Sequence, residues 1–361
     1  MPRFFLVLLL AIFVVALSIT DDADLVCDDV SGECSLRASD EDKVAMEEDA
    51  VIPKGANPEG RPLEVGLGQC SDRHEQCVDF SHQGECQENP GWMIVNCPQS
   101  CDACHLLDPK VRCDRKRLNV TLEPSLGPGD MHRIFSQIES KYNDRYNVTV
   151  LSSDPWIVTF DEFLTEEEID ALIYEVDGQW ERSTDTGIEN AFGEVGRVVS
   201  QSRTSSNAWC RKSCEANPLV HNIMAKIEEV TQIPMVNYES FQVLKYDISQ
   251  KYNTHHDSSD MQKQLACGPR VMTFFLYLSD VDEGGETAFP LINIAVKPQR
   301  RKALLWANTL NHAPSDMDQR TMHEARPVIR GKKFAANSWI HMYNFETPNL
   351  HGCTGAFDQL S

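Results

Sequence analysis

The pattern of apolar and polar positions predicts a packed domain from residue 154 onward. The apolar run Trp156–Phe160 has the length of a buried strand. Thr165, followed three residues later by Glu168, has the pattern of a helix capping box, in which each side chain binds the other residue's backbone N–H. A second helix is expected to begin at Asn217 and Pro218, with an apolar face formed by Leu219, Ile223, Ile227 and Val230.

Short apolar runs separated by Gly, Pro and Asp follow the second helix and have the composition of strands. They span residues 240–246, 271–278, 303–306, 327–330 and 334–343. Short strands of this kind after leading helices favour an α+β, mainly β fold, with an antiparallel barrel or jelly roll and flanking helices.

The N-terminal segment has the pattern of a targeting sequence. An apolar run at residues 4–17 follows Arg3, with small residues at Ala16 and Ser18. The run is shorter than the ~20 residues that a helix needs to span a bilayer, so a cleaved signal peptide is preferred over an uncleaved anchor. Two N-glycosylation sequons, at Asn119 and Asn147, fit the same route. The expected location is the endoplasmic reticulum lumen or the secretory pathway, with membrane attachment only if the segment is not cleaved.

The charge of the chain narrows the class of protein further. Its 361 residues carry a formal charge of −22, which argues against binding to nucleic acid because phosphates require a surface rich in Lys and Arg. Residues 21–65 hold 14 acidic and four basic side chains, so almost half of the excess lies in one stretch. This stretch is predicted to be a disordered linker, in which Cys27 and Cys34 could close a small loop.

Six of the 13 cysteines lie within residues 70–104, which is too short a segment to bury a core of its own. Disulfide bonds are therefore expected to stabilise it, although the sequence alone leaves the pairing open, and a zinc site at Cys101 and Cys104 is a weaker alternative. Cys210 and Cys214 are expected to form a local disulfide on a helix. An odd total means that at least one cysteine has no partner within the chain.

The strongest chemical signal is His255 and Asp257, two residues apart in a stretch where alternation would place both on one face of a strand. With His323, 66 residues later, they would form a facial triad for a ferrous ion. A chance pair on a surface strand is the alternative. Lys333 stands ten residues beyond His323, and a buried Lys there would require an anion such as the C5 carboxylate of 2-oxoglutarate. Lys332 is the adjacent alternative, since alternation puts one of the two side chains inside.

Two parts of the chain resemble known families. The cysteine spacing C-x6-C-x8-C-x10-C-x3-C-x2-C resembles the ShK toxin-like (ShKT) module, which implies the pairs Cys70–Cys104, Cys77–Cys97 and Cys86–Cys101. Residues 154–345 resemble the prolyl 4-hydroxylases of the 2-oxoglutarate/Fe(II) dioxygenase superfamily. The matching motifs include Ser202-Arg-Thr-Ser205, Tyr252-x-x-His-x-Asp257, Gly284-Gly-Glu-Thr-x-Phe-Pro290, His323-x-x-x-Pro-Val-Ile329, Gly331-x-Lys333 and Trp339-Ile-His341.

The second resemblance implies a double-stranded β-helix and a set of site roles. His255, Asp257 and His323 would bind Fe(II), and Lys333 would bind the C5 carboxylate of 2-oxoglutarate. Tyr246 and Thr287 would donate hydrogen bonds to this co-substrate, with Trp339 near the metal pocket. The residues implied for the peptide groove are Arg203, Ser205, Glu239, Tyr252, Arg270 and His341. O2 would be the second co-substrate, and L-ascorbate would re-reduce the iron. Lys302 and Ser338 depart from the family pattern, outside these positions.

The resulting hypothesis is a secretory-pathway peptidyl-proline 4-hydroxylase acting on Pro-rich polypeptides of collagen-like or cell-wall type, because Lys rather than Arg at position 333 resembles that branch. A disulfide-isomerase-type subunit is a conceivable partner. The alternatives are hydroxylation of another residue type, a secreted ShKT binding protein with an inactive barrel and, more remotely, a zinc hydrolase. The expected segments are a signal peptide or anchor at 1–20, linker 21–67, ShKT domain 68–106, connecting region 107–153, dioxygenase domain 154–347 and C-terminal tail 348–361.

Overall fold

The computed structural model describes residues 25–27, 34–36, 70–193 and 195–355. The chain divides into two units, Met1–Glu64 and Val65–Ser361. In the first unit, β1 (Leu25–Cys27) pairs antiparallel with β2 (Cys34–Leu36), and the backbone of Cys27 lies opposite that of Cys34. The side chains of this pair, the predicted targeting segment and most of the predicted linker lie outside the described residues. Within the described part, no helix combines the length and apolar character needed to cross a bilayer.

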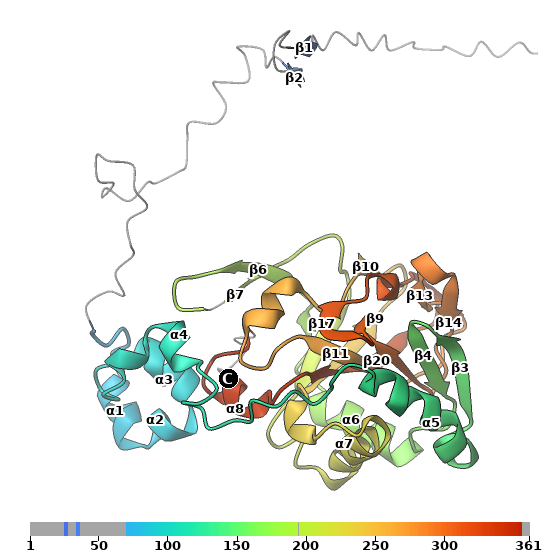
Figure 1. The fold of residues 1–361 in the computed structure, drawn as a ribbon. Coiled ribbons are helices and arrows are strands. Elements are labelled where there is room, and N and C mark those ends of the chain that lie inside the picture. The colour runs from blue at the N-terminus through green and yellow to red at the C-terminus, as the bar shows by residue number, and fades with distance from the viewer. Residues whose placement is uncertain (1–24, 28–33, 37–69, 194, 356–361) are drawn as a thin grey trace, which may run out of the picture. The chain divides into compact units, whose positions relative to one another are not determined.

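An antiparallel sheet of eight strands forms the centre of the second unit (Figure 1). Its strand order is β3-β4-β15-β11-β20-β9-β8-β5, so strands far apart in the sequence lie side by side. In that order the strands are Val148–Ser153, Trp156–Phe160, Ala303–Ala307, Arg270–Tyr277, Lys333–His341, Phe241–Tyr246, Ser206–Cys210 and Glu181–Arg182.

A smaller antiparallel sheet has the order β10-β18-β13-β14 and shares a hydrophobic cluster with one face of the large sheet. Its strands are Tyr252–His255, His323–Ala325, Thr287–Phe289 and Ile294–Val296. Three further strand pairs are β6 (Asp185–Glu189) with β7 (Val195–Val198), β12 (Glu283–Gly284) with β19 (Val328–Arg330), and β16 (Thr309–Leu310) with β17 (Ala313–Met317). Two antiparallel sheets around one cluster give the mixed α+β, β-sandwich architecture that the sequence predicts.

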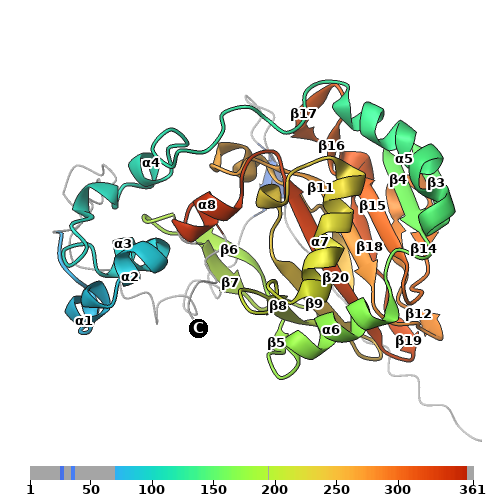
Figure 2. The same ribbon diagram turned by 90° about the horizontal axis from the view of Figure 1, so that it is seen from below.

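Three long helices cover the other face of the large sheet (Figure 2). They are α5 (Asp130–Tyr146), α6 (Glu166–Val176) and α7 (Pro218–Thr231). The cysteine-rich segment and the residues after it contain α1 (Cys77–His82), α2 (Glu85–Glu88), α3 (Pro90–Asn96) and α4 (Pro109–Arg112), and α8 (Glu346–Leu350) follows the last strand.

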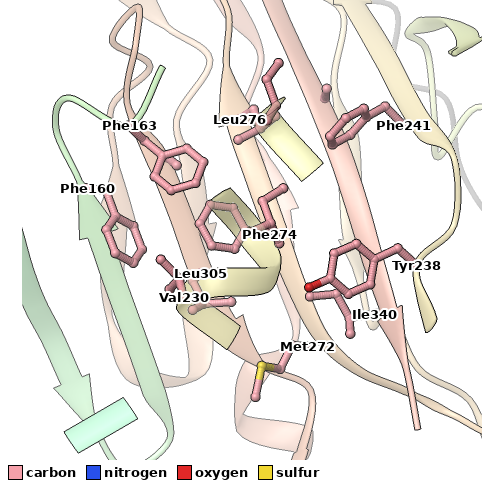
Figure 3. Packing of buried hydrophobic residues seen from close by; sticks show 14 of the residues in the cluster. Phe160, Phe163, Val230, Tyr238, Phe241, Met272, Phe274, Leu276, Leu305 and Ile340 are labelled. Carbon is pink, nitrogen blue, oxygen red and sulfur yellow. The ribbon is translucent and has the colours of Figure 1, made fainter. Parts of the chain in front are cut away.

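Strand β11 shows how the sheet is buried on both faces. Phe274 and Leu276 belong to the cluster that includes the helices (Figure 3), whereas Phe275 and Tyr277 belong to the cluster between the sheets. Because side chains alternate along a strand, a strand between two packed layers has to be apolar almost throughout. Thr273, which is fully buried, is the polar exception in the middle of this strand.

The helix starts match the capping signals. The Thr165 hydroxyl accepts the N–H of Glu168 at 3.2 Å, and the Glu168 carboxylate accepts the N–H of Thr165 at 2.9 Å. Asn217 caps α7, but the predicted apolar face was wrong in one position. Leu219 is 40% exposed, and Val220 is buried in its place. Residues 220, 223, 227 and 230 keep the helical spacing, whereas residue 219 is rotated away by about 100°.

The predicted strand runs correspond to β9, β11, β15, β19 and β20, with ends shifted by no more than two residues. The segment 107–153, expected to connect two domains, contributes α5 and β3. Phe135, Ile138 and Val148 of this segment belong to the same hydrophobic core as the large sheet. The sequence analysis therefore missed structure that packs on the domain from outside its predicted boundary.

Five disulfides occur among the described residues. The cysteine-rich segment has the bonds Cys70–Cys104, Cys77–Cys97 and Cys86–Cys101, which are the pairs that the ShKT resemblance implies. Cys210 and Cys214 are bonded, but they join the end of β8 to the following turn, so the expectation of a helix was wrong. Cys113 is bonded to Cys353, and Cys267 is a free, buried thiol.

Replacing Phe274 with Ala should lower the free energy of unfolding by about 3–5 kcal/mol, because the ring is fully buried between the sheet and the helices. Urea unfolding without reductant would measure the change. Tyr174→Ala is the control, since that side chain is 79% exposed and its loss should cost less than about 0.5 kcal/mol. Equal losses in the two variants would contradict the assigned core.

Candidate active site

His255, Asp257 and His323 come together beside the hydrophobic cluster that lies between the two sheets. Their ligand atoms lie within 4.8 Å of one another, and they form the one such group found among the described residues. His255 Nε2 is 3.8 Å from Asp257 Oδ1, and His323 Nε2 is 3.6 Å from Asp257 Oδ2. The two histidines come from paired strands, because His255 of β10 lies opposite His323 of β18. Asp257 lies two residues beyond His255, just after the strand ends, and still reaches the same point.

Hydrogen bonds orient both imidazoles for metal binding. His255 Nδ1 lies 2.9 Å from the carbonyl oxygen of Asn253, and His323 Nδ1 lies 3.0 Å from that of Thr321. A carbonyl only accepts, so each Nδ1 carries the proton and each Nε2 presents its lone pair to the centre of the group. This donor set fits a divalent metal, and its three protein ligands on one side are typical of a non-haem ferrous site.

The third ligand is held by a chain of donors that the sequence analysis missed. The Thr273 hydroxyl donates to Asp257 Oδ2 at 2.7 Å, and Asn308 Nδ2 donates to the Thr273 oxygen at 2.8 Å. The signal in the sequence was the single hydroxyl residue inside the apolar strand 271–276. Such supporting contacts fix a metal-binding carboxylate before the metal arrives.

Protonation states at the site suit metal binding. Burial, followed by the neighbouring His323, lowers the pKa of His255 to about 3, and burial also lowers the pKa of His323. Burial alone would raise the pKa of Asp257, but His323, His255 and the Thr273 hydroxyl bring it to about 2. Two neutral imidazoles and one carboxylate are therefore ready at neutral pH without the loss of a proton.

Lys333 is completely buried on β20, whereas Lys332 is exposed and pairs with Asp247 at 3.0 Å. The Lys333 ammonium donates to the carbonyl oxygen of Gly285 at 2.8 Å, and no ion pair of Lys333 with a carboxylate is found among the described residues. Burial lowers its pKa to about 7. Gly284, before the acceptor, has φ +78°, and a Cβ there would collide with the carbonyl oxygen of Pro327. A buried ammonium without a carboxylate can hold an anionic group.

The Lys333 ammonium lies close to two aromatic rings of the pocket that contains the metal group. The Lys333 nitrogen is 5.3 Å from the ring centres of Tyr246 and Phe275. Those rings also line the pocket that contains the metal group, together with Leu244, Tyr252, Thr287, Trp306, Glu324, Ala325 and Asn337. The Tyr277 hydroxyl donates to the Thr287 oxygen at 2.9 Å, and the Tyr277 ring is 5.6 Å from the ammonium. Tyr277 is thus a further hydroxyl-bearing residue near the Lys333 ammonium.

A second charged cluster lies beside the metal group. Glu239 accepts from Arg270 Nε at 2.5 Å and lies 2.7 Å from His341 Nε2, while His341 Nδ1 lies 2.8 Å from the carbonyl oxygen of Gly268. Burial opposes the charged forms, but Arg270 and His341 hold the pKa of Glu239 at about 2. In turn, Cys267 and Glu239 raise the pKa of His341 to about 10. Both imidazole nitrogens therefore carry protons.

The cluster is joined to the metal site through Arg270. Its Nη1 donates to the backbone oxygen of Asp257 at 3.3 Å, and its guanidinium lies 3.8 Å from the centre of the Trp339 ring. Trp339, predicted near the metal pocket, thus contacts the arginine that reaches the backbone of Asp257, and its cofactor role stays a prediction. The indole beside the metal ligands is that of Trp306, 4.8 Å from the His323 ring, which alternation alone could not single out.

The remaining residues predicted for the peptide groove are Arg203, Ser205 and Tyr252. The Tyr252 ring stacks on His255 at 3.6 Å, and the Arg203 guanidinium lies 4.7 Å from the centre of the Tyr252 ring. Arg203 also donates to Gln242 at 2.8 Å, and the buried Ser205 hydroxyl contacts that of Ser183 at 2.9 Å. The predicted groove residues thus form two groups, one in contact with His255 through Tyr252 and one in contact with the backbone of Asp257 through Arg270. Asn119 and Asn147, the sequon residues, are both exposed.

Comparisons with known proteins agree with this site. Residues 241–341 match the 2OG-Fe(II) oxygenase superfamily, and residues 69–104 match the ShK domain-like family. "Probable prolyl 4-hydroxylase 7" of Arabidopsis thaliana is 35% identical over 222 residues, which cover 56% of this chain and 68% of the relative. "Probable prolyl 4-hydroxylase 6" of the same plant is 34% identical over 239 residues, covering 60% and 80%. A solved viral collagen prolyl hydroxylase from Paramecium Bursaria Chlorella virus-1 is 25% identical, with a TM-score of 0.39, and covers 51% of this chain and 95% of that one.

The chain belongs to the prolyl 4-hydroxylase family of 2OG-Fe(II) oxygenases. It is a 2-oxoglutarate-dependent dioxygenase of the prolyl 4-hydroxylase type, with Fe(II) and 2-oxoglutarate as its cofactors and a ShK-like segment ahead of the oxygenase part.

Replacing Thr273 with Val should weaken Fe(II) binding about 10- to 100-fold, because Asp257 would lose the donor that orients it. Anaerobic equilibrium dialysis against Fe(II) would measure the affinity. Thr254→Val makes the same chemical change at an exposed residue whose hydroxyl contacts Glu324, and it should bind iron normally. An unaltered affinity in the Thr273 variant would remove that residue from the metal site.

Proposed function

We propose that this chain is a peptidyl-proline 4-hydroxylase of the secretory pathway, which hydroxylates proline in Pro-rich polypeptides of collagen-like or cell-wall type. Membership of the family implies a proline-containing peptide as substrate. The observation that carries the proposal is the ammonium of Lys333, buried with no carboxylate partner among the described residues. It lies next to the Tyr246 and Phe275 rings, which line the pocket of the His-Asp-His group. An anion with a metal-chelating end would satisfy both the ammonium and the metal group at once.

Fe(II) and 2-oxoglutarate would supply the oxidising chemistry when bound. His255, Asp257 and His323 would hold the metal through Nε2 and carboxylate atoms that their hydrogen bonds already orient. The Lys333 ammonium would pair with the C5 carboxylate, and Tyr246, Thr287 and Tyr277 offer hydroxyls along the way. The apolar rings of Phe275 and Trp306 would keep water from the space between.

The two charged groups beside the metal suit a Pro-rich strand. Proline has no backbone N–H, so such a strand presents mainly carbonyl acceptors and ring faces. Arg270 offers a guanidinium donor near Asp257, while both N–H groups of His341 are used by Glu239 and Gly268. Arg203 with the Tyr252 ring offers a donor and an aromatic face near His255. Glu239 neutralises part of this positive charge and orients Arg270. A Pro-rich chain is already extended, so binding it costs little ordering entropy.

The five disulfides of the described residues support folding in an oxidising compartment, as expected for the secretory pathway. We propose L-ascorbate as the reductant of iron and leave a disulfide-isomerase-type subunit as a candidate partner, both from the family resemblance.

Purified protein should form succinate from 2-oxoglutarate in proportion to a Pro-rich peptide, and His255→Ala should abolish this activity because one metal ligand is lost. Mass spectrometry of the peptide should place the added oxygen on proline. His312→Ala removes an exposed histidine and should keep full activity. An active His255 variant would contradict the triad, and oxygen on another residue type would make the chain a different peptidyl hydroxylase.

Replacing Lys333 with Met should raise the KM for 2-oxoglutarate at least about tenfold, since the distal carboxylate would lose the buried cation proposed to pair with it. In the wild type this KM should also rise with pH above about 7, because the pKa of Lys333 is lowered to about 7 and only the protonated form pairs with an anion.

The matched control for this prediction is Lys332→Met. Its ammonium is exposed and pairs with Asp247 outside the pocket, so both the KM and its pH dependence should remain those of the wild type. Loss of the pH dependence should be confined to the Lys333 variant. A Lys333→Met enzyme with an unchanged KM would show that the co-substrate is anchored elsewhere.

A further inference from the structure

The hairpin formed by β6 (Asp185–Glu189) and β7 (Val195–Val198) is set apart from the two main sheets. Its strands hydrogen-bond as a two-stranded sheet of their own among the described strands. A two-stranded ribbon is marginally stable by itself in water, so its position depends on what holds its two ends. Both ends of the hairpin contact other parts of the second unit.

The base of the hairpin is fastened to the peptide groove and the metal strand. Asp185 Oδ2 accepts from the hydroxyl of Ser202 at 2.6 Å and from that of Ser200. The backbone N–H of Asn253 donates to the Ser202 carbonyl at 2.8 Å, two residues before the ligand His255. Arg203 Nη1 reaches the carbonyl oxygen of Thr184, next to Asp185, at 3.4 Å. The orientation of the hairpin base is therefore coupled to Arg203 and Tyr252 of the groove.

The tip of the hairpin is held by residues from the N-terminal side of the unit. The guanidinium of Arg73, in the cysteine-rich segment, lies 4.3 Å from the centre of the Phe192 ring. Arg112 Nη2, from α4 just after that segment, donates to the Phe192 carbonyl oxygen at 2.5 Å. Two arginines from before the oxygenase part thus contact one residue at the tip.

Arg112 is unusual because its side chain is completely buried. Its Nη1 donates to the carbonyl oxygens of Leu106 and Leu107 at 3.2 and 3.4 Å. A buried guanidinium is costly, so hydrogen bonds of this kind have to compensate the lost hydration. The next residue, Cys113, is bonded to Cys353, which ties this part of the backbone covalently to the C-terminal side of the oxygenase fold. The support that holds the hairpin tip is therefore itself anchored.

We propose that Arg112, assisted by Arg73, is a positioning residue that fixes the β6–β7 hairpin beside the groove, so that the cysteine-rich segment contributes to the affinity for the polypeptide substrate. None of the described contacts of Arg112 involves the metal group or Lys333, so its effect is expected on polypeptide binding. This inference rests on the proposed function for its kinetic consequence, but not for its structural one.

The structural consequence is tested by hydrogen exchange on the full chain. In Arg112→Met, amides of residues 185–193 and 195–198 should exchange about tenfold faster than in the wild type, while those of β11 and β20 should not change. Arg112→Lys keeps one donor and should lie between the two. Arg117→Met is the control, because this exposed arginine of the same segment donates to the Arg112 carbonyl instead of to the hairpin. Unchanged exchange in the hairpin would overturn the proposal.

The kinetic consequence is tested with the same variants and a Pro-rich polypeptide. In Arg112→Met the KM for the polypeptide should rise about five- to tenfold, the factor expected for the loss of one buried hydrogen bond, with kcat and the KM for 2-oxoglutarate unchanged. Phe192→Ala removes the ring that Arg73 contacts and should act in the same direction, which covers the case of a poorly folded Arg112 variant. A fall in kcat with unchanged polypeptide KM would overturn the positioning role. If the wild type hydroxylates no proline, the proposed function fails, and hydrogen exchange alone decides on the hairpin contact.

Discussion

The oxygenase fold buries one ammonium, that of Lys333, completely away from water. Two features fix the position of the ammonium. Lys333 lies on β20, a central strand of the eight-stranded sheet, and the ammonium donates a hydrogen bond to the carbonyl oxygen of Gly285. A charge held by a single neutral acceptor in a low-dielectric interior weakens the folded protein until an anion arrives. Under the proposed function this unpaired charge favours the binding of a dicarboxylate, and the nearby metal ligands define which dicarboxylate fits.

The regions proposed for the co-substrate and for the polypeptide substrate also differ in charge. Phe275 and Tyr277 line the interior with apolar and hydroxyl groups, whereas Arg270, Glu239 and His341, proposed for the polypeptide groove, form a compensated charge cluster. Asp257 contacts both regions, through its carboxylate to the metal group and Thr273, and through its backbone oxygen to Arg270. A shift of Arg270 on polypeptide binding would therefore reach the segment that carries a metal ligand.

Much of the fold and the site could be predicted because the information is local. Thr165 and Glu168 specify a capping box within four residues. Alternation shows that one of Lys332 and Lys333 points inside, and the family motif selects Lys333. Thr273 and Asn308 were missed, since their contact with Asp257 depends on how β11 pairs with β15. The helical phase at Leu219 failed because it depends on packing against the sheet. The position of Trp306 beside His323 was missed for the same reason, and the buried Arg112 is visible only in three dimensions.

The Cys113–Cys353 bond closes a ring of chain with a sequence separation of 240 residues, which contains nearly all of the oxygenase part. By loop-closure entropy, such a ring restricts the unfolded chain by about 5 kcal/mol. The bond also provides a covalent path for mechanical force that does not run through the oxygenase part. Tension applied at the N-terminal side of Cys113 passes through sulfur to Cys353 without stretching the strands between them, so a pull on that side would leave the iron ligands undisturbed.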